Sequence, residues 1–190
     1  VMYHTTNCLG ELQLSVEPLR LSVLVVGGGE GATVREVLKW NPSRVDWVDI
    51  DEELVKMCRE HLKWAPESVY TDPCVHFFPL DIEVALKVQL VASRYDVIIL
   101  DLPDPDGETG YLYSPPFWQS IYDHLNPGGF IGTHCGPVRP WGLIGEGFQR
   151  IKDVRVQMDD LKDNFLFKSW KYLFYSHHIP SFQSEWGFLI

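Results

Sequence analysis

Three carboxylates lie close together in a short, proline-rich stretch near the middle of the chain: Asp101, Asp104 and Asp106, with Pro103 and Pro105 between them. Like charges at this spacing raise one another's pKa and attract cations, and proline stiffens the backbone that carries them. Such a group can be a solvated acidic loop, can ligate a metal ion through Asp101 and Asp104, or can bind an ammonium group and remove its proton. No histidine joins them at ligand spacing, so we expect no metal here.

A second chemical signal is the stretch from Leu21 to Ala32, LSVLVVGGGEGA, in which an apolar run ends in glycines and a carboxylate. Glycine allows positive φ and a close approach of the backbone to a ligand. The glycines are Gly27, Gly28, Gly29 and Gly31. Their spacing formally fits a dinucleotide-binding loop, but Glu30 would oppose the pyrophosphate that a helix N-terminus attracts. A ligand with a ribose, no phosphate and some positive charge fits better.

Two further acids follow apolar segments of the chain. Asp49 ends a segment that begins near residue 45, and Asp81 follows one that begins near residue 75. Asp49 is placed to accept hydrogen bonds from the hydroxyls of a ribose, and Asp81 could accept one from an adenine amino group. Aspartate also commonly caps helices, as we expect of Asp51, so each has a purely structural alternative.

The elements that position these residues alternate between strands and helices. Strands are expected at residues 22–26, 45–50, 75–80, 95–100 and 130–133, and helices at 32–40, 52–62, 84–90 and 115–125. Residues 102–110 are expected to form a loop and residues 126–129 a turn. A strand near 11–16, a helix near 144–151, and strands near 154–158, 172–177 and 187–190 complete the pattern. It predicts an α/β fold, a Rossmann-like, doubly wound and mainly parallel sheet, with the acids at one ligand-binding edge.

The amino-acid composition limits the size of the domain and the classes of molecule that the chain could bind. A chain of 190 residues with 45% hydrophobic residues is long enough for one ordinary domain with a full core. The net charge of −10 disfavours nucleic acid and anionic membranes and is compatible with a cationic small molecule. We expect no membrane span, no signal peptide and a cytoplasmic location. The four cysteines form no C-x-x-C pair, so free thiols are expected.

Four motifs resemble, in order, those of the polyamine aminopropyltransferases, the spermidine and thermospermine synthase family. They are LVVGGGEGATVREVLK, WVDIDEELVKMCREHL, YDVIILDLPDP and HHIPSFQSEWGF. The resemblance covers residues 21–190. The glutamate of GGGEG, the D-L-x-D-P form of the acidic loop and the last motif are most similar to thermospermine synthase.

The resemblance implies transfer of the aminopropyl group of decarboxylated S-adenosylmethionine, a co-substrate, to putrescine or spermidine, with release of methylthioadenosine. It implies no prosthetic group. The glycine loop would bind this donor, Asp49 its ribose and Asp81 its adenine. Glu30 and Asp101 would bind its terminal ammonium group. Asp101, assisted by Asp104, would be the base that activates the attacking amine.

The chain also departs from the family pattern. The family's N-terminal β-strand domain is not evident, so residues 1–20 are interpreted as a remnant of it or a linker, and residues 21–190 as the catalytic domain. Tyr3 and His4 resemble part of a polyamine-binding motif, and Trp186 is a candidate for stacking on a polyamine chain. His134 stands where a glutamine is usual. The family also implies a homo-oligomer, a dimer or a tetramer.

Two other functions stay open. An S-adenosylmethionine-dependent methyltransferase of class I would share the fold, but such enzymes usually carry an acid near the end of the first strand, where this chain has Val25 and Val26. Glu30 and Asp101 would also repel the carboxylate of intact S-adenosylmethionine. A non-catalytic protein that binds a nucleoside or a polyamine is the other alternative, and the presence of Asp101 and Asp104 speaks against it.

Overall fold

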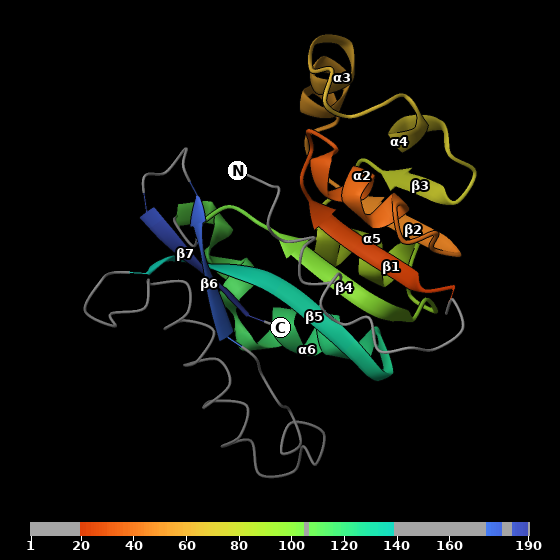
Figure 1. The fold of residues 1–190 in the computed structure, drawn as a ribbon. Helices are drawn as coiled ribbons and strands as arrows, with labels where there is room; N and C mark the ends of the chain where they lie inside the picture. Colours follow the sequence, from red (N-terminus) through yellow and green to blue (C-terminus); the bar gives the residue numbers. More distant parts are fainter. Residues whose placement is uncertain (1–19, 105–106, 139–173, 180–183, 190) are drawn as a thin grey trace.

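A seven-stranded sheet forms the centre of the computed structural model, which describes residues 20–104, 107–138, 174–179 and 184–189 (Figure 1). Its strands are β1 (Ser22–Gly27), β2 (Arg44–Val48), β3 (Val75–Phe78), β4 (Tyr95–Asp101), β5 (Leu125–Val138), β6 (Phe174–Ile179) and β7 (Ser184–Leu189). They lie in the order β3-β2-β1-β4-β5-β7-β6. Neighbours from β3 to β5 pair in parallel, whereas β7 is antiparallel to both β5 and β6. The predicted mainly parallel sheet is confirmed.

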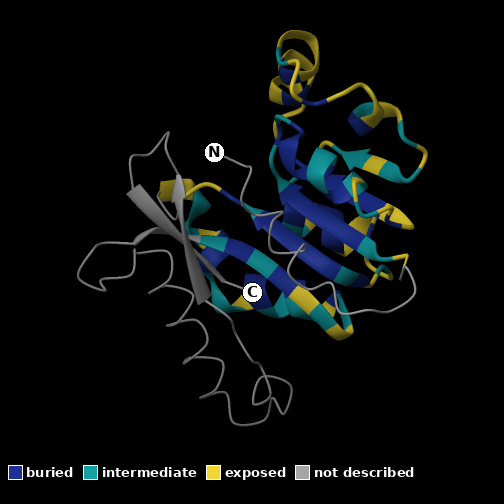
Figure 2. Ribbon diagram, viewed as in Figure 1, coloured by how far each residue is buried: buried dark blue, intermediate teal, exposed yellow. Residues whose placement is uncertain are grey.

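Helices cover both faces of this sheet. They are α2 (Ala32–Leu38), α3 (Glu52–His61), α4 (Ser68–Thr71), α5 (Ile82–Val88) and α6 (Pro115–Asp123), with a 3-10 helix η1 (Gly107–Tyr113). Alternate residues of β1 point to opposite faces: Leu24 and Val26 pack with residues of α5 and α6, and Val23 and Val25 with residues of α2, α3 and α4. The central strands are therefore buried on both sides, while most of α3 is exposed (Figure 2).

Local sequence signals explain where several helices begin. The Asp51 side chain accepts a hydrogen bond from the backbone N–H of Leu54 and caps α3, as predicted. Ser114 caps α6, and proline at its first position supplies a favourable φ. Asp81 caps α5 through the backbone N–H groups of Glu83 and Val84. The Asp51 and Asp81 caps fix the chain just after β2 and β3.

The structure corrects the prediction in four places. Residues 126–129, predicted as a turn before the fifth strand, lie within β5, where the pairing with β4 shifts between Leu125 and Phe130 and Gly128 has φ 80°. Part of the segment predicted as a loop is the 3-10 helix η1, and α4 was not predicted. The helix α2 ends at Leu38 rather than near residue 40. The segments expected at 11–16, 144–151 and 154–158 lie outside the described residues.

Other predictions agree with the structure. The two late strands are observed as β6 and β7, with β7 starting three residues earlier than expected. Cys58 and Cys74 are free thiols. Within the described part of the chain, no helix is long and apolar enough to cross a membrane.

A network around Asp96 ties together the beginnings of three strands. One carboxylate oxygen accepts hydrogen bonds from the backbone N–H and the hydroxyl of Ser22, both at 2.8 Å, and the other accepts one from the Asn126 amide at 2.8 Å. Partial burial opposes the charge, but these hydrogen bonds outweigh it and lower the pKa of Asp96. The network fixes the starting points of β1, β4 and β5 relative to one another.

We predict that Asp96→Ala lowers the free energy of unfolding by about 2–4 kcal/mol, because hydrogen bonds to a charged group are lost and their donors are left unpaired. Because the folded-state pKa is lowered, the difference from wild type is present above about pH 4 and disappears as pH falls through that lowered value. Urea unfolding at several pH values measures it.

Asp123→Ala is the matched control, because exposed Asp123 accepts a hydrogen bond from Gln119 within the same helix and should contribute only about 0.5 kcal/mol or less. Equal effects of the two substitutions would show that the Asp96 network does not hold the strands.

Candidate active site

A cavity of about 670 Å³ opens at the carboxyl ends of β1, β2, β3 and β4. This edge is where ligands bind in open parallel sheets, and the volume suits a nucleoside-sized molecule. Glu30, Asp49, Asp81 and Asp101 all line the cavity, together with the glycine loop. Its apolar walls include Ile50, Leu54, Leu80, Leu102 and Leu112. The structure therefore brings the predicted acids together at one edge, as expected.

The glycine loop passes very close to the end of β4. Gly27 has φ 81°, and a Cβ at this position would lie 2.1 Å from the backbone oxygen of Asp101. A side chain cannot be accommodated there, because the obstacle is backbone rather than a movable side chain. The buried Trp47 indole donates a hydrogen bond to the carbonyl of Gly27 at 2.9 Å. The loop is thus fixed against Asp101.

Asp101 is the last residue of β4, and its carboxylate is held by a threonine. The Thr33 hydroxyl, fully buried in α2, donates a hydrogen bond to Asp101 Oδ2 at 2.8 Å. Burial raises the pKa of Asp101; the Thr33 hydrogen bond and nearby His134 offset this only in part. The Nε2–H of His134 donates to the carbonyl of Leu102 at 2.5 Å. Thr33 was not predicted to belong to the site.

Asp49 and Glu30 also carry charge that the protein only partly compensates. Asp49 is 9% exposed and accepts a hydrogen bond from the backbone N–H of Asp51. Burial, with the charges of Asp51 and Asp101, raises the pKa of Asp49. Burial, with the charges of Asp101 and Asp49, likewise raises the pKa of Glu30. Within the part of the chain that the structure describes, Glu30 Oε1 is buried and has no hydrogen-bond partner.

A buried carboxylate oxygen without a donor is costly, so it indicates a missing partner. The partner that fits is a cation or a hydrogen-bond donor, since the charges of Asp101 and Asp49 raise the pKa of Glu30. An anion such as a pyrophosphate would be repelled by Glu30, Asp49 and Asp101. Among the described residues, no group of three or more His, Cys, Asp and Glu side chains is arranged to hold a metal ion.

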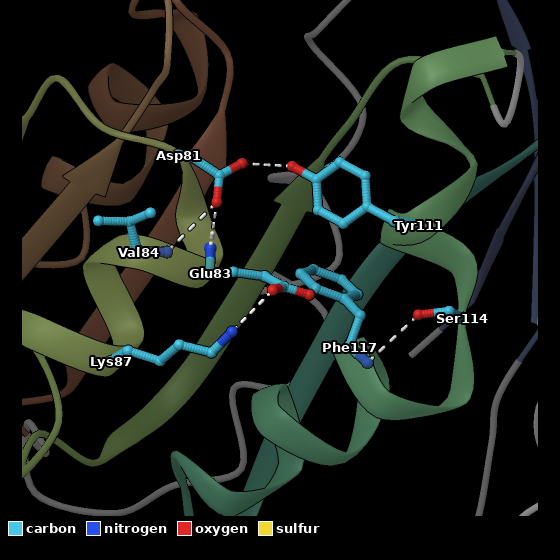
Figure 3. A network of polar contacts seen from close by, with 7 residues as sticks. All are labelled: Asp81, Glu83, Val84, Lys87, Tyr111, Ser114 and Phe117. Atoms are coloured by element: carbon cyan, nitrogen blue, oxygen red, sulfur yellow. Dashed lines mark hydrogen bonds and ion pairs between the residues drawn. The ribbon is translucent and has the colours of Figure 1, made fainter.

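Asp81 has two roles at once (Figure 3). Its Oδ1 accepts from the backbone N–H groups of Glu83 at 2.9 Å and Val84 at 3.2 Å, which is the helix-capping alternative weighed above. Its Oδ2 accepts a hydrogen bond from the hydroxyl of Tyr111 in η1. Both Asp81 and Tyr111 line the cavity. Sequence reasoning missed Tyr111, because no local pattern links two residues on different loops.

The structure sets Asp104 apart from the other acids. It is exposed and does not line the cavity, and its backbone carbonyl accepts a hydrogen bond from the Thr109 hydroxyl at 2.8 Å. Asp106, Tyr3 and His4 lie outside the described residues. The third carboxylate of the acidic stretch and the first part of the predicted acceptor site therefore stay predictions.

Trp186 lies on β7, where its backbone pairs with Pro137 of β5. Pro137 is four residues beyond Thr133, which pairs with Leu100 of β4. The backbone of Trp186 therefore lies past the carboxyl end of β4, at the edge of the sheet where Asp101 ends its strand.

Comparisons with known proteins indicate the family of this chain. Residues 2–138 match the family model of the spermine/spermidine synthase domain. Polyamine aminopropyltransferase 2 of Pseudomonas aeruginosa is 33% identical over 192 residues, which cover 94% of this chain and 50% of that protein. The polyamine aminopropyltransferase of Aeropyrum pernix is 32% identical over 100% of this chain and 56% of its own length. The chain spans about half the length of these curated relatives.

Solved structures share the fold. A spermidine synthase in complex with the transition-state analogue AdoDATO superposes with a TM-score of 0.69 at 24% identity, over 90% of this chain and 54% of that one. The spermidine synthase of Thermotoga maritima gives a TM-score of 0.66 at 22% identity, over 90% and 53% of the two chains. With the matching family model and a cavity lined by the predicted acids, the conclusion is direct: the chain belongs to the spermine/spermidine synthase family.

Proposed function

We propose that this protein transfers the aminopropyl group of decarboxylated S-adenosylmethionine to an amine of a polyamine and releases methylthioadenosine. The observation that carries the proposal is the cavity in which Glu30, Asp49 and Asp101 meet and a buried oxygen of Glu30 has no partner among the described residues. Both reactants are cations, and this site supplies the negative charge that they need. The names of the relatives and the analogue bound to a solved neighbour support the same reaction.

In this proposal the donor occupies the cavity in one orientation. Asp49, at the end of β2, would accept hydrogen bonds from the two ribose hydroxyls, and Asp81 would accept one from the adenine amino group. The apolar residues between them would enclose the base. Glu30 and Asp101 would then face the aminopropyl end, whose ammonium group would supply the partner that Glu30 Oε1 lacks among the described residues. Decarboxylated S-adenosylmethionine is a co-substrate in this scheme.

The chemistry requires one proton to be removed. An aliphatic amine has a pKa of about 10, so it arrives protonated and cannot attack until the proton leaves. Asp101 would take that proton. The nitrogen lone pair then forms a bond to the aminopropyl carbon next to the sulfonium, the carbon–sulfur bond breaks, and its electron pair stays on the neutral thioether of methylthioadenosine. The raised pKa of Asp101 makes it a better base than an ordinary aspartate.

The acceptor is a polyamine, with putrescine and spermidine as the two candidates. Asp104, Tyr3, His4 and Trp186 are proposed to contact it or to assist Asp101. A mixture of putrescine and spermidine offered to the protein with the donor, followed by chromatography of the products, would identify the acceptor that is used. Intact S-adenosylmethionine would be a poor donor, because its carboxylate would face Glu30 and Asp101.

We predict that Asp101→Asn lowers kcat by about 100- to 10,000-fold, because the general base is lost. The dissociation constant of methylthioadenosine, which has no ammonium group, should change less than twofold. Release of methylthioadenosine measures turnover, and calorimetry measures binding. Asp104→Asn is the matched comparison and should cost no more than about tenfold, since Asp104 is exposed outside the cavity lining. A near-normal rate for Asp101→Asn removes Asp101 from the role of base.

We predict that Glu30→Gln and Asp49→Ala change the affinities for decarboxylated S-adenosylmethionine and methylthioadenosine in different ways. Glu30→Gln should weaken decarboxylated S-adenosylmethionine about tenfold or more and leave methylthioadenosine nearly unchanged, because only the donor carries the ammonium group. Asp49→Ala should weaken both ligands about tenfold to a hundredfold, because both contain the ribose. Equal losses for the two ligands in Glu30→Gln would place the ammonium group elsewhere.

We predict that Asp101→Asn also stabilises the ligand-free protein near pH 7. A carboxyl group whose pKa is raised by folding favours the folded state only in its protonated form, so its cost develops as pH rises from about 4 through the folded-state value. Asparagine removes the charge and keeps an oxygen for the Thr33 hydroxyl. Each ~1 kcal/mol gained raises the Tm by about 2–4 °C for a protein of this size.

The difference in Tm between Asp101→Asn and wild type should therefore be near zero at about pH 4 and positive at neutral pH. Thermal melts followed by circular dichroism in ligand-free buffer measure it. A variant less stable than wild type at neutral pH would show that the charge of Asp101 is well compensated without substrate.

A further inference from the structure

Tyr111 links the 3-10 helix η1 to the start of α5 through a hydrogen bond at the cavity (Figure 3). It lies on η1, which follows β4, and its hydroxyl reaches Asp81 at the start of α5, which follows β3. The ring packs edge-on against Phe117, with centroids 6.4 Å apart and an interplanar angle of 82°. Its exposed fraction is 39%, and it lines the cavity with Asp81. The contact is therefore both anchored and open to a ligand.

Tyr111 and Asp81 have hydrogen-bond acceptors left for a ligand but no donor. Tyrosine has a single hydroxyl proton, and Tyr111 donates it to Asp81 Oδ2. Burial and this hydrogen bond raise the pKa of Tyr111, so the phenol keeps its proton in neutral solution. Asp81 Oδ1 already accepts from two backbone N–H groups of α5. What remains toward the cavity is acceptor capacity, on Asp81 Oδ2 and on the phenolic oxygen.

We propose that Tyr111 and Asp81 act together as a reader of an exocyclic amino group on the purine, with Tyr111 as a specificity-determining residue. The inference rests on the proposed function, which places an adenine nucleoside in this cavity. The two N–H bonds of a 6-amino group can be donated to the two acceptors, one to each. A 6-oxo purine instead presents a carbonyl oxygen to these two acceptors, so that oxygen receives no hydrogen bond, and its N1–H can be donated to only one of them. Tyr111 could rescue it only by giving up its hydrogen bond to the charged Asp81.

The test compares binding of methylthioadenosine and methylthioinosine, which differ in this 6-substituent, to wild type and to Tyr111→Phe by calorimetry. Wild type should bind methylthioadenosine at least about 30-fold more tightly than methylthioinosine. Tyr111→Phe keeps the ring on Phe117 but removes one acceptor. It should weaken methylthioadenosine about five- to tenfold and change methylthioinosine less than twofold. In turnover assays the Tyr111→Phe variant should have a higher KM for the donor and a nearly unchanged kcat, because the reacting atoms of the donor are remote from its adenine ring.

Asp81→Asn supplies a second measurement. Asparagine still caps a helix, so α5 should be preserved. Its amide can turn an N–H toward the cavity, so the preference for methylthioadenosine over methylthioinosine should shrink by about tenfold or more. Methylthioribose, which lacks the base, is the control ligand and should bind all three proteins equally.

The outcomes separate the inference from the function on which it rests. Tighter binding of methylthioadenosine to Tyr111→Phe would show that Tyr111 competes with the base for Asp81, which overturns the proposal. Unchanged selectivity in Tyr111→Phe overturns it as well, while leaving aminopropyl transfer intact. A wild-type protein that binds neither nucleoside contradicts both the inference and the proposed function.

Discussion

Burial of carboxylates in one cavity, together with the repulsion between them, is the constraint on which the rest of this structure depends. Glu30, Asp49 and Asp101 come from three different strand ends, and burial raises the pKa of all three. Neighbouring carboxylates add to the shift at Glu30 and Asp49. A protein without a cationic ligand gains nothing from such an arrangement, and Glu30 keeps one oxygen that no described residue satisfies. The free energy stored in this repulsion becomes available when cationic reactants enter the cavity.

The scaffold makes this concentration of charge tolerable. Two apolar cores, one on each face of the sheet, fix β1 and β4 side by side, and their parallel pairing places Gly27 directly opposite Asp101. The Asp96 network fixes the other end of the same strands. Stability is therefore supplied along the length of the strands, while the carboxyl edge is left free for binding.

Much of this could be predicted from the sequence, since it depends on residues close together in the chain. The β-branched run of β1 followed by glycines, and the aspartates after β2, β3 and β4, are local signals with a direct geometric consequence in a parallel sheet. What the sequence did not indicate depends on contacts across the sheet. Thr33 reaches Asp101 from a helix 68 positions away, and Tyr111 reaches Asp81 across 30 positions.

A local signal also misled at one turn. The Asn126–Gly129 segment has strong turn residues, yet it is accommodated within β5 by a shift in the pairing with β4, so tertiary pairing outweighs local preference. Asp104, predicted to assist Asp101, lies on the exposed segment beyond the strand that ends at Asp101, so its role stays a prediction. Residue spacing alone does not distinguish a side chain at a strand end from one a few positions further.

Proton release on binding tests the central claim most directly. Calorimetry of decarboxylated S-adenosylmethionine in buffers with different ionisation enthalpies, at about pH 5 to 6, counts the protons exchanged. Cations that enter a site of carboxylates with raised pKa values must lower those values, so the account predicts that protons are released, and that neutral methylthioadenosine releases fewer. Proton uptake, or no proton exchange with either ligand across this pH range, would contradict the view that carboxylates with raised pKa values bind the substrate.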